Sequence, residues 1–238
     1  MEFALGYTKS TLARRNNSAL IAELCVAAAL ISAVKLGIRI PAAAAALRTD
    51  KPLLIHWQFW GAAAGWIAFS LYWEIAKTGA VAVRVESGFS RGIHVLLANI
   101  ALLLVVAPIV GLGRFMPMWP VAMTAGCILE IAGLGFAIWA RLHLGRNWSG
   151  EITLKVDHEL VRSGPYRRVR HPIYSGLLAM FLGSALVTGE WLAVLGLALG
   201  AFAYIRKLRL EEVNMDSAFG AEYAAYRRES SALVPFLY

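Results

Sequence analysis

Charged residues and cysteines are scarce in this chain of 238 residues. Only 16% of the residues are charged, 59% are apolar, and the mean hydropathy is +0.60. Disordered chains carry more charge and ordinary soluble domains are about a quarter charged, so the first class is excluded and a soluble enzyme is disfavoured. Eight prolines exclude a collagen-like chain, and two cysteines inside apolar runs exclude a disulfide or metal framework. The composition predicts an integral membrane protein with no metal site.

Long apolar runs are what the sequence has in their place. Four of them are long enough to cross a bilayer as helices: residues 19–40, 53–73, 92–112 and 118–140. The first follows a polar N-terminus without a small-residue cleavage site, so it indicates a retained membrane helix and not a signal peptide. Glu130 lies within the fourth run, where a carboxylate is costly unless it is paired or faces a polar cavity. Two interpretations stay open: Glu130 pairs with Lys35, or it lines a polar tunnel.

A fifth apolar region, residues 173–205, is too long for one comfortable span. It is interrupted by Thr188-Gly189-Glu190, which is typical of a turn. We therefore expect a hairpin of two short helices. The predicted fold class is all-α: a polytopic bundle with three spans in residues 1–117 and a core in residues 118–238. Within that core, residues 141–172 form a polar segment, 173–205 the hairpin and 206–238 a C-terminal segment.

The basic residues support this topology. The formal net charge is +8, and with six segments eighteen Lys and Arg fall on the side of both termini against four on the other. Because Lys and Arg are enriched in cytoplasmic loops, both termini and residues 141–172 are expected to be cytoplasmic. Membrane lipids explain the basic excess, so we expect no nucleic-acid partner; Arg162, Arg167, Arg168 and Arg170 are interpreted as contacts to anionic lipids.

The polar segment that holds the candidate site residues begins at Arg141. Near the end of this segment, His171 and Pro172 precede an apolar run, and proline is tolerated in a first helical turn. This places His171 at a helix N-terminus at the membrane surface, with Tyr174 just inside it. After the hairpin, Glu211 and Glu212 follow three basic residues. That pair is consistent with interfacial salt bridges or with binding of an ammonium or sulfonium cofactor.

These residues resemble a known family. RHPIYSG at 170–176, the apolar hairpin, the Glu pair and FGAEYAAY at 219–226 are similar, in order and spacing, to the C-terminal half of the isoprenylcysteine carboxyl methyltransferases and their bacterial relatives. LGRNWS at 144–149 fits the same pattern. The resemblance covers residues 141–238, about 40% of the chain.

The resemblance implies S-adenosylmethionine as the methyl donor and a site between the cytoplasmic segment and the hairpin. It makes residues 141–172 the cytoplasmic cofactor-binding segment and residues 206–238 the segment that closes the cofactor site. Carried over residue by residue, the cofactor contacts fall on the following positions: Glu151, His158, Glu159, Leu160, Val161, Tyr166, His171, Pro172, Ile173, Tyr174, Glu211 and Glu212. The basic residue that holds the acceptor carboxylate in the family corresponds to Lys207, where the eukaryotic pattern has Arg. Lysine lacks the bidentate fork of arginine, so Arg206 or Arg209 is an alternative. Lys207, Arg206 and Glu211 are the candidate catalytic residues.

The implied function is methyl transfer to a lipophilic acceptor, with carboxyl O-methylation of an isoprenylcysteine-like substrate as the first expectation. This small-molecule or prenylated substrate is expected to enter from the bilayer. The alternatives are another lipid, amine, thiol or phenolic acceptor, or an NADPH-dependent enzyme similar to the sterol reductases. Pro172 favours the methyltransferase over the reductase. If the acceptor is an ionised carboxylate, the reaction needs alignment and exclusion of water but no general base.

Overall fold

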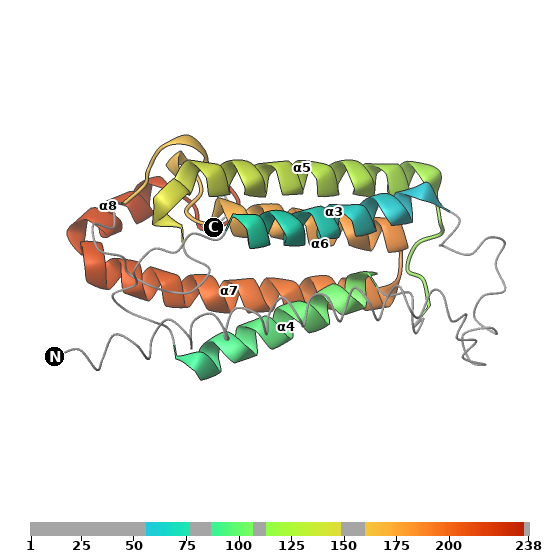
Figure 1. Ribbon diagram of the computed structural model, residues 1–238, viewed down its shortest axis with the longest axis horizontal. Helices are drawn as coiled ribbons and strands as arrows, with labels where there is room; N and C mark the ends of the chain where they lie inside the picture. Colours follow the sequence, from blue (N-terminus) through green and yellow to red (C-terminus); the bar gives the residue numbers. More distant parts are fainter. Residues whose placement is uncertain (1–55, 77–86, 107–112, 149–159, 236–238) are drawn as a thin grey trace. The chain divides into compact units, whose positions relative to one another are not determined.

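A computed structural model of the chain describes residues 56–76, 87–106, 113–148 and 160–235. The α-helices of this part (Figure 1) are α3 (Trp57–Ile75), α4 (Gly88–Val106), α5 (Pro120–Leu144), α6 (Pro172–Thr188), α7 (Trp191–Phe219) and α8 (Ala221–Glu229). Two short 3₁₀ turns, η2 (Gly145–Asn147) and η3 (Gly164–Arg167), join them. Within the described ranges β-structure is limited to two isolated bridges. The predicted all-α class is confirmed.

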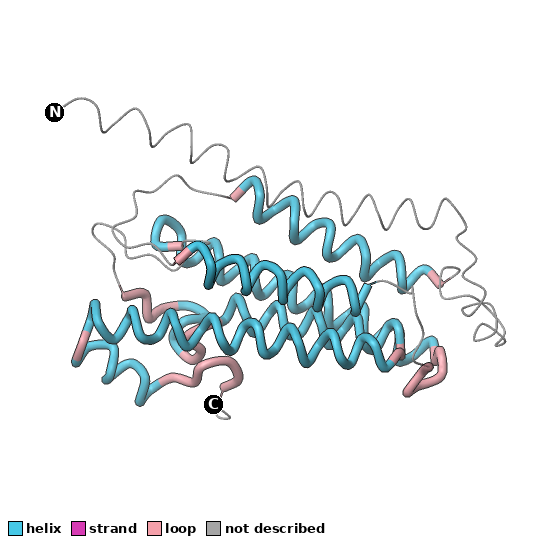
Figure 2. Tube along the Cα trace, turned by 90° about the horizontal axis from the view of Figure 1, so that it is seen from below, coloured by secondary structure: helices cyan, strands magenta, loops and turns pink. Residues whose placement is uncertain are grey.

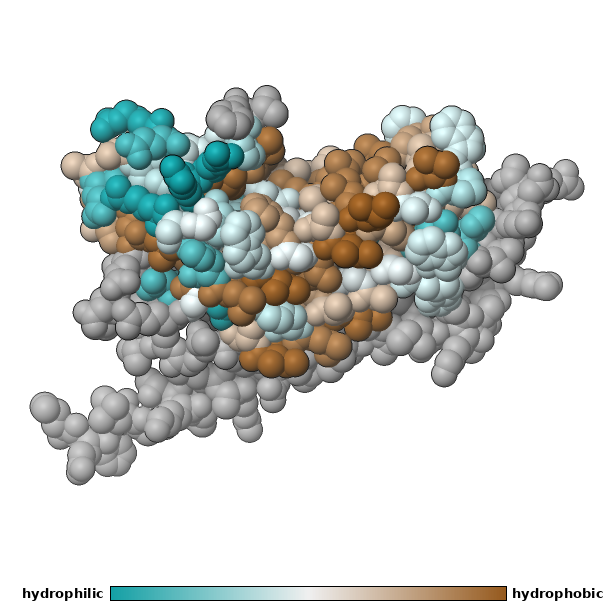
Figure 3. All heavy atoms as spheres, turned by 90° about the horizontal axis from the view of Figure 1, so that it is seen from above, coloured by the Kyte–Doolittle hydropathy of each residue, from teal (hydrophilic) through white to brown (hydrophobic). Residues whose placement is uncertain are grey.

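The helices α4, α5 and α7 are long and apolar enough to cross a membrane, and the protein is an integral membrane protein. The predicted span at 53–73 forms α3, although its tryptophans and Gln58 lower its hydropathy below that of these three. The predicted span at 19–40 lies outside the described residues. On the face shown in Figure 3, apolar side chains dominate the middle and the most hydrophilic ones gather at one end.

The hairpin is present, and its second arm is longer than expected. Gly189 ends α6 with a φ of 63°, a left-handed conformation that glycine adopts without steric cost. The helix α7 then continues through Glu211 and Glu212 to Phe219, so it has 29 residues and is not a short arm. Gly220, with φ 50°, is the first residue that interrupts it. The Glu pair therefore lies on a rigid helix that also crosses the apolar layer.

Glycines allow α5 and α6 to pack closely along their length, in a bundle whose helices run side by side (Figure 2). A Cβ atom on Gly126 would lie 2.6 Å from the carbonyl oxygen of Gly183, and one on Gly133 would lie 2.6 Å from that of Gly176. The two pairs are spaced seven residues apart on each helix, and Glu130 lies between them on α5. This contact fixes the start of α6 against the end of α5, and the candidate site forms there.

The interior of the bundle holds a short polar chain. The indole Nε1 of Trp66 on α3 donates to the hydroxyl of Ser184 on α6 at 2.9 Å, and that hydroxyl donates to Glu130 Oε2 at 2.7 Å. Glu130 is 1% exposed, and its other oxygen, Oε1, has no hydrogen-bond partner. Lys35, the partner expected for Glu130, lies outside the described residues. That Glu130 lines an acceptor tunnel stays a prediction.

Side-chain bonds between helices tie both ends of the bundle. At the end that carries α8, Arg141 donates to the carbonyl of Ala76, and Arg206 on α7 donates to the hydroxyl of Ser90 on α4 at 2.8 Å. At the opposite end, Arg114 donates to the carbonyl of Thr188 and forms an ion pair with Glu190. Burial raises the pKa of the Glu190 carboxyl. The positive charge of Arg114 offsets only part of this effect, so the pKa lies above its usual value.

Candidate active site

The candidate site is built around the chain entering α6. Backbone bonds hold this entry against the C-terminal segment: the amide of Arg170 donates to the carbonyl of Ser231 at 2.9 Å, and that of His171 donates to Ala232 at 3.0 Å. Pro172 begins α6 and is fully buried, so the helix start is fixed in direction. His171 is the residue immediately before the helix, as predicted, and its ring makes no capping bond to the helix backbone.

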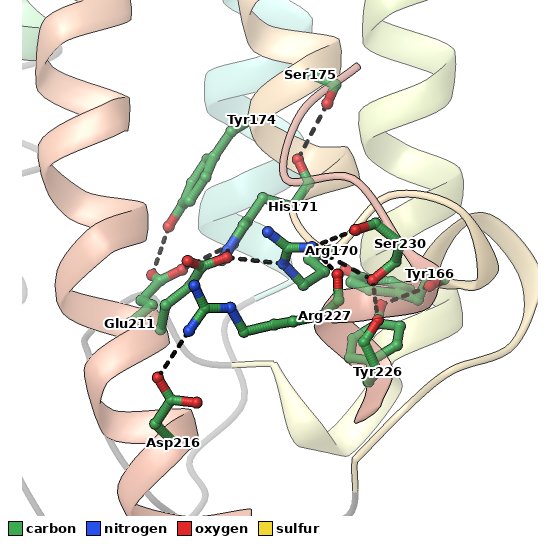
Figure 4. A network of polar contacts seen from close by, with 11 residues as sticks. Tyr166, Arg170, His171, Tyr174, Ser175, Glu211, Asp216, Tyr226, Arg227 and Ser230 are labelled. Atoms are coloured by element: carbon green, nitrogen blue, oxygen red, sulfur yellow. Dashed lines mark hydrogen bonds and ion pairs between the residues drawn. The ribbon is translucent and has the colours of Figure 1, made fainter. Parts of the chain in front are cut away.

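The ring of His171 contacts both carboxylates of α7, and Figure 4 shows it beside Glu211. Its Nδ1 is 3.4 Å from Glu211 Oε2, and its Nε2 is 3.4 Å from Glu212 Oε1. The hydroxyl of Tyr174 donates to the second oxygen of Glu211 at 2.5 Å. Tyr174 belongs to α6, His171 directly precedes α6, and the Glu pair belongs to α7. The structure therefore brings the predicted His, Tyr and Glu pair into one cluster.

Arg170 connects this cluster to the C-terminal segment. Its Nε donates to Glu212 Oε1 at 2.8 Å, and its NH1 donates to the backbone carbonyl of Ser230. The side chains of Arg170 and Glu212 are only 10% and 14% exposed. Sequence interpretation placed Arg170 among the lipid contacts, and this is wrong: its guanidinium donates to Glu212. Figure 4 shows Arg170 within the polar network, beside Ser230. The signal that could have found it is its position next to His171.

The pKa of His171 reflects its position between two carboxylates. Burial alone would lower this pKa, but the contacts and negative charges of Glu211 and Glu212 outweigh burial and raise it above its usual value. The imidazolium form is therefore favoured, with one positive charge between two negative ones. Nε2 is buried, and its contact with Glu212 is an ion pair at 3.4 Å without good hydrogen-bond geometry.

Aromatic rings extend the site from the start of α6 towards α7. The rings of His171 and Tyr174 stack with centroids 5.6 Å apart, and those of Tyr174 and Tyr204 stack at 5.3 Å. The ammonium of Lys207 lies 5.9 Å from the centroid of the Tyr174 ring. Tyr204 on α7 was not among the residues predicted from the sequence; it lies seven residues before Glu211, on the same face of the helix.

The remaining predicted residues are distributed as follows. Tyr166 on η3 is buried, accepts a hydrogen bond from Tyr226 at its backbone oxygen at 2.5 Å, and has its pKa raised by burial. Ile173 packs against the buried core, and Leu160 and Val161 are half-buried. Three predicted cofactor residues, Glu151, His158 and Glu159, lie outside the described residues.

The candidate catalytic residues point in different directions. Glu211 and Lys207 both lie beside Tyr174, and the positive charge of Lys207 acts on Glu211. Arg206 instead donates to Ser90 on α4, as expected for adjacent residues about 100° apart around a helix. Of Lys207 and Arg206, Lys207 is thus the one that faces the cluster of His171, Tyr174 and the Glu pair.

The sequence of the same region matches a known family. Residues 121–222, from the start of α5 to the start of α8, match the model of the phospholipid methyltransferase family. This range contains the α5–α6 contact and every member of the His–Tyr–Glu cluster.

Individual relatives also match. The chain is 33% identical over 178 residues to a methanethiol S-methyltransferase of Mycobacterium tuberculosis, covering 64% of this chain and 66% of the relative. It is 30% identical over 101 residues to the protein-S-isoprenylcysteine O-methyltransferase of Schizosaccharomyces pombe, covering 41% and 43%. A solved eukaryotic intramembrane Ras methyltransferase structure aligns with a TM-score of 0.44 at 20% identity over 64% of this chain and 54% of that one. The chain thus spans less than two thirds of these relatives.

Proposed function

We propose that the chain transfers a methyl group from S-adenosylmethionine to a lipophilic acceptor at the membrane surface. This is supported by the match of residues 121–222 to the phospholipid methyltransferase family model and by the similarity of the chain to a protein-S-isoprenylcysteine O-methyltransferase. The first candidate acceptor is the carboxylate of an isoprenylcysteine-like molecule. The observation that carries the proposal is the cluster of His171, Tyr174, Glu211 and Glu212 beside the apolar layer.

The residues of this cluster fit the chemistry of the donor. S-adenosylmethionine carries an ammonium and a sulfonium group, which carboxylates and aromatic faces both stabilise. Glu211 and Glu212 supply the carboxylates, and Tyr174 and Tyr204 supply stacked rings. The imidazolium of His171, whose Nε2 makes only a long contact of 3.4 Å to Glu212, supplies a positive charge that suits the carboxylate of the donor. When bound, the donor supplies the electrophilic methyl group.

The chain's own residues would orient the reactants and exclude water. The rigid α7 carries Glu211 and Lys207 one turn apart, so a cation for the acceptor carboxylate lies beside the carboxylates for the donor. Removal of water strengthens both interactions, because charges attract more strongly at low dielectric. Such positioning accounts for several kcal/mol of a displacement barrier, on the order of 7 or more in well-oriented reactions. No general base is required for an ionised carboxylate.

The proposal includes the topology. The end of the bundle that carries α8 and the cluster would face the cytoplasm together with both termini, because most of the Lys and Arg residues belong to it. A polar donor would then enter from the cytoplasm. A prenylated or other lipophilic acceptor would enter from the bilayer.

A thiol acceptor is the second candidate. It is supported by the longer match to the methanethiol S-methyltransferase, which covers 64% of the chain against 41% for the Schizosaccharomyces enzyme. It is also supported by Lys207, because a single ammonium lacks the fork with which arginine pairs to a carboxylate. A thiolate has one charged atom and needs no fork.

The test is calorimetric binding of S-adenosylhomocysteine to the detergent-purified protein, with NADPH as comparator. We expect binding in the micromolar range, weakened about tenfold or more by Glu211→Gln and by Glu212→Gln, since a charge-assisted bond contributes about 1.5–3 kcal/mol. Glu222 lies on α8 and forms an exposed ion pair with Arg162, so Glu222→Gln is the matched control. Binding of NADPH alone, or equal affinity in all variants, would overturn the proposal.

A further inference from the structure

Residues 230–233, which we call the C-terminal strap, run beside residues 168–171 at the entry to α6. The amide of Ser231 donates to the carbonyl of Arg168 at 3.0 Å, and the carbonyl of Ser231 accepts from the amide of Arg170 at 2.9 Å. This alternation is the pattern of a parallel β-bridge. The strap is therefore a short extended segment that pairs with the chain leading into the candidate site, as a strand is added to the edge of a sheet.

Side chains also hold the strap at both of its ends. Arg170 donates to the carbonyl of Ser230 (Figure 4), and the hydroxyl of Ser175, in the first turn of α6, donates to the carbonyl of Leu233. Between them, Ala232 and Leu233 are 1% and 8% exposed. The strap is thus fixed by backbone bonds, by two side-chain donors and by two buried apolar side chains. The sequence interpretation assigned no role to Ser175.

The strap contacts two residues that shape the proposed donor site. The guanidinium of Arg170 bonds to Ser230 and to Glu212 Oε1, the latter at 2.8 Å. The amide of His171 donates to the carbonyl of Ala232 at 3.0 Å. The backbone of His171, with φ −123° and ψ 59°, is neither helical nor extended, so contacts of this kind set its direction in place of a regular element. Detachment of the strap would therefore loosen both residues that contact Glu212.

We propose that the strap positions His171 and Arg170 for the donor, so that attachment of the strap and binding of S-adenosylmethionine favour one another. Ser175 is then a positioning residue, because its hydroxyl acts on the donor only through the strap. Two events that need the same ordered residues share the free energy of ordering them. By linkage, the strap strengthens donor binding by the factor by which the donor strengthens attachment of the strap. This inference rests on the proposed methyltransferase function.

The first test is calorimetric binding of S-adenosylhomocysteine to the full-length protein with substitutions at Ser175. In Ser175→Ala the carbonyl of Leu233 loses its hydroxyl donor, and attachment of the strap is weakened. We expect the affinity to fall about fivefold, at the lower end of the usual range for coupled sites. Ser175→Thr keeps the hydroxyl and should restore the affinity. Ser217→Ala removes a hydroxyl that donates to the carbonyl of Asn214 on the exposed part of α7, and it is the matched control.

Hydrogen exchange of the wild type measures attachment of the strap directly and needs no variant. The amides that donate across the contact, those of Arg170, His171 and Ser231, exchange only when the strap detaches. Saturating S-adenosylhomocysteine should slow their exchange by the same factor, about fivefold. The turn at the opposite end of the bundle is the control: the amide of Phe115 donates to the carbonyl of Gly189 at 3.0 Å, and its exchange should not change.

The outcomes separate the strap from the function. Equal affinity in the wild type and in Ser175→Ala, with unchanged exchange at the strap, would overturn the positioning role and leave the methyltransferase intact. Equal slowing at both ends of the bundle would also overturn it, because the donor would then stabilise the whole protein. If Ser175→Ala does not fold, the exchange of the wild type decides. Failure of the wild type to bind S-adenosylhomocysteine would instead overturn the proposed function, and the role of the strap with it.

Discussion

Arg170 and Glu212 form an ion pair at 2.8 Å with both side chains largely buried, and this pair joins the start of α6 to α7. Arg170 also donates to the carbonyl of Ser230. One guanidinium therefore holds a carboxylate of the proposed donor site and the segment that follows α8. The pair links the stability of the C-terminal segment to the geometry of the site.

Removing the guanidinium should destabilise the protein strongly. In Arg170→Ala the carboxylate of Glu212 stays buried without its ion-pair partner, and such losses cost about 3–5 kcal/mol. Thermal unfolding of the detergent-purified protein measures the effect. Arg167→Ala, an exposed arginine on η3, should change the midpoint little. Adding Glu212→Gln to Arg170→Ala should restore part of the loss, and no restoration would contradict this account.

The raised pKa of His171 predicts a specific pH dependence. A raised folded-state pKa contributes stability that is complete below the unfolded value of about 6.5 and is lost as the pH rises through the folded value. The wild type should therefore exceed His171→Gln in melting temperature most at about pH 6, and the difference should shrink at about pH 9. Melting curves at both pH values check this; a difference that grows with pH would contradict it.

The path of the chain could be predicted from the sequence to a considerable extent. Gly189 beside a charge marked the hairpin turn, and Pro172 marked the start of α6. The end of α7 was missed because the polar residues 206–219 were interpreted as the end of the helix. They contain neither glycine nor proline, and the first helix-breaking residue is Gly220. Polarity marked the edge of the apolar layer and not the end of the helix.

The partners of the site residues were much less predictable. The Glu pair and His171 were assigned through a family resemblance. Arg170 was assigned to lipid because its partner, Glu212, is 42 residues away in the sequence. Arg206 and Ser90 are separated by 116 residues. Such pairs depend on the rotational phase of each helix and on which helices are neighbours, and neither follows from composition. The stacking of Tyr174 on Tyr204 depends on the same tertiary packing.

Close packing of α5 on α6 predicts a sharp difference between two glycines of one helix. A Cβ atom on Gly133 would lie 2.6 Å from the carbonyl of Gly176, whereas one on Gly135 would have no neighbour within 4 Å. Gly133→Ala should therefore destabilise the protein by about 1–3 kcal/mol through overpacking. Gly135→Ala should be neutral or stabilising, because alanine favours helix. Thermal unfolding of both variants decides, and equal effects would contradict the close approach.

Two consecutive hydrogen bonds run from Trp66 through Ser184 to Glu130, so a single hydroxyl satisfies two buried polar groups. Ser184→Ala removes the acceptor for the indole of Trp66 and the donor to Glu130 at once. Each buried polar group left unpaired costs about 1–3 kcal/mol, so the variant should lose more stability than one hydrogen bond provides. Ser217→Ala removes a hydroxyl on the exposed part of α7 and is the control. In a double-mutant cycle Trp66→Phe and Ser184→Ala should be non-additive, because the indole has already lost its partner when the hydroxyl is gone. Additive effects would mean that the two side chains do not depend on one another.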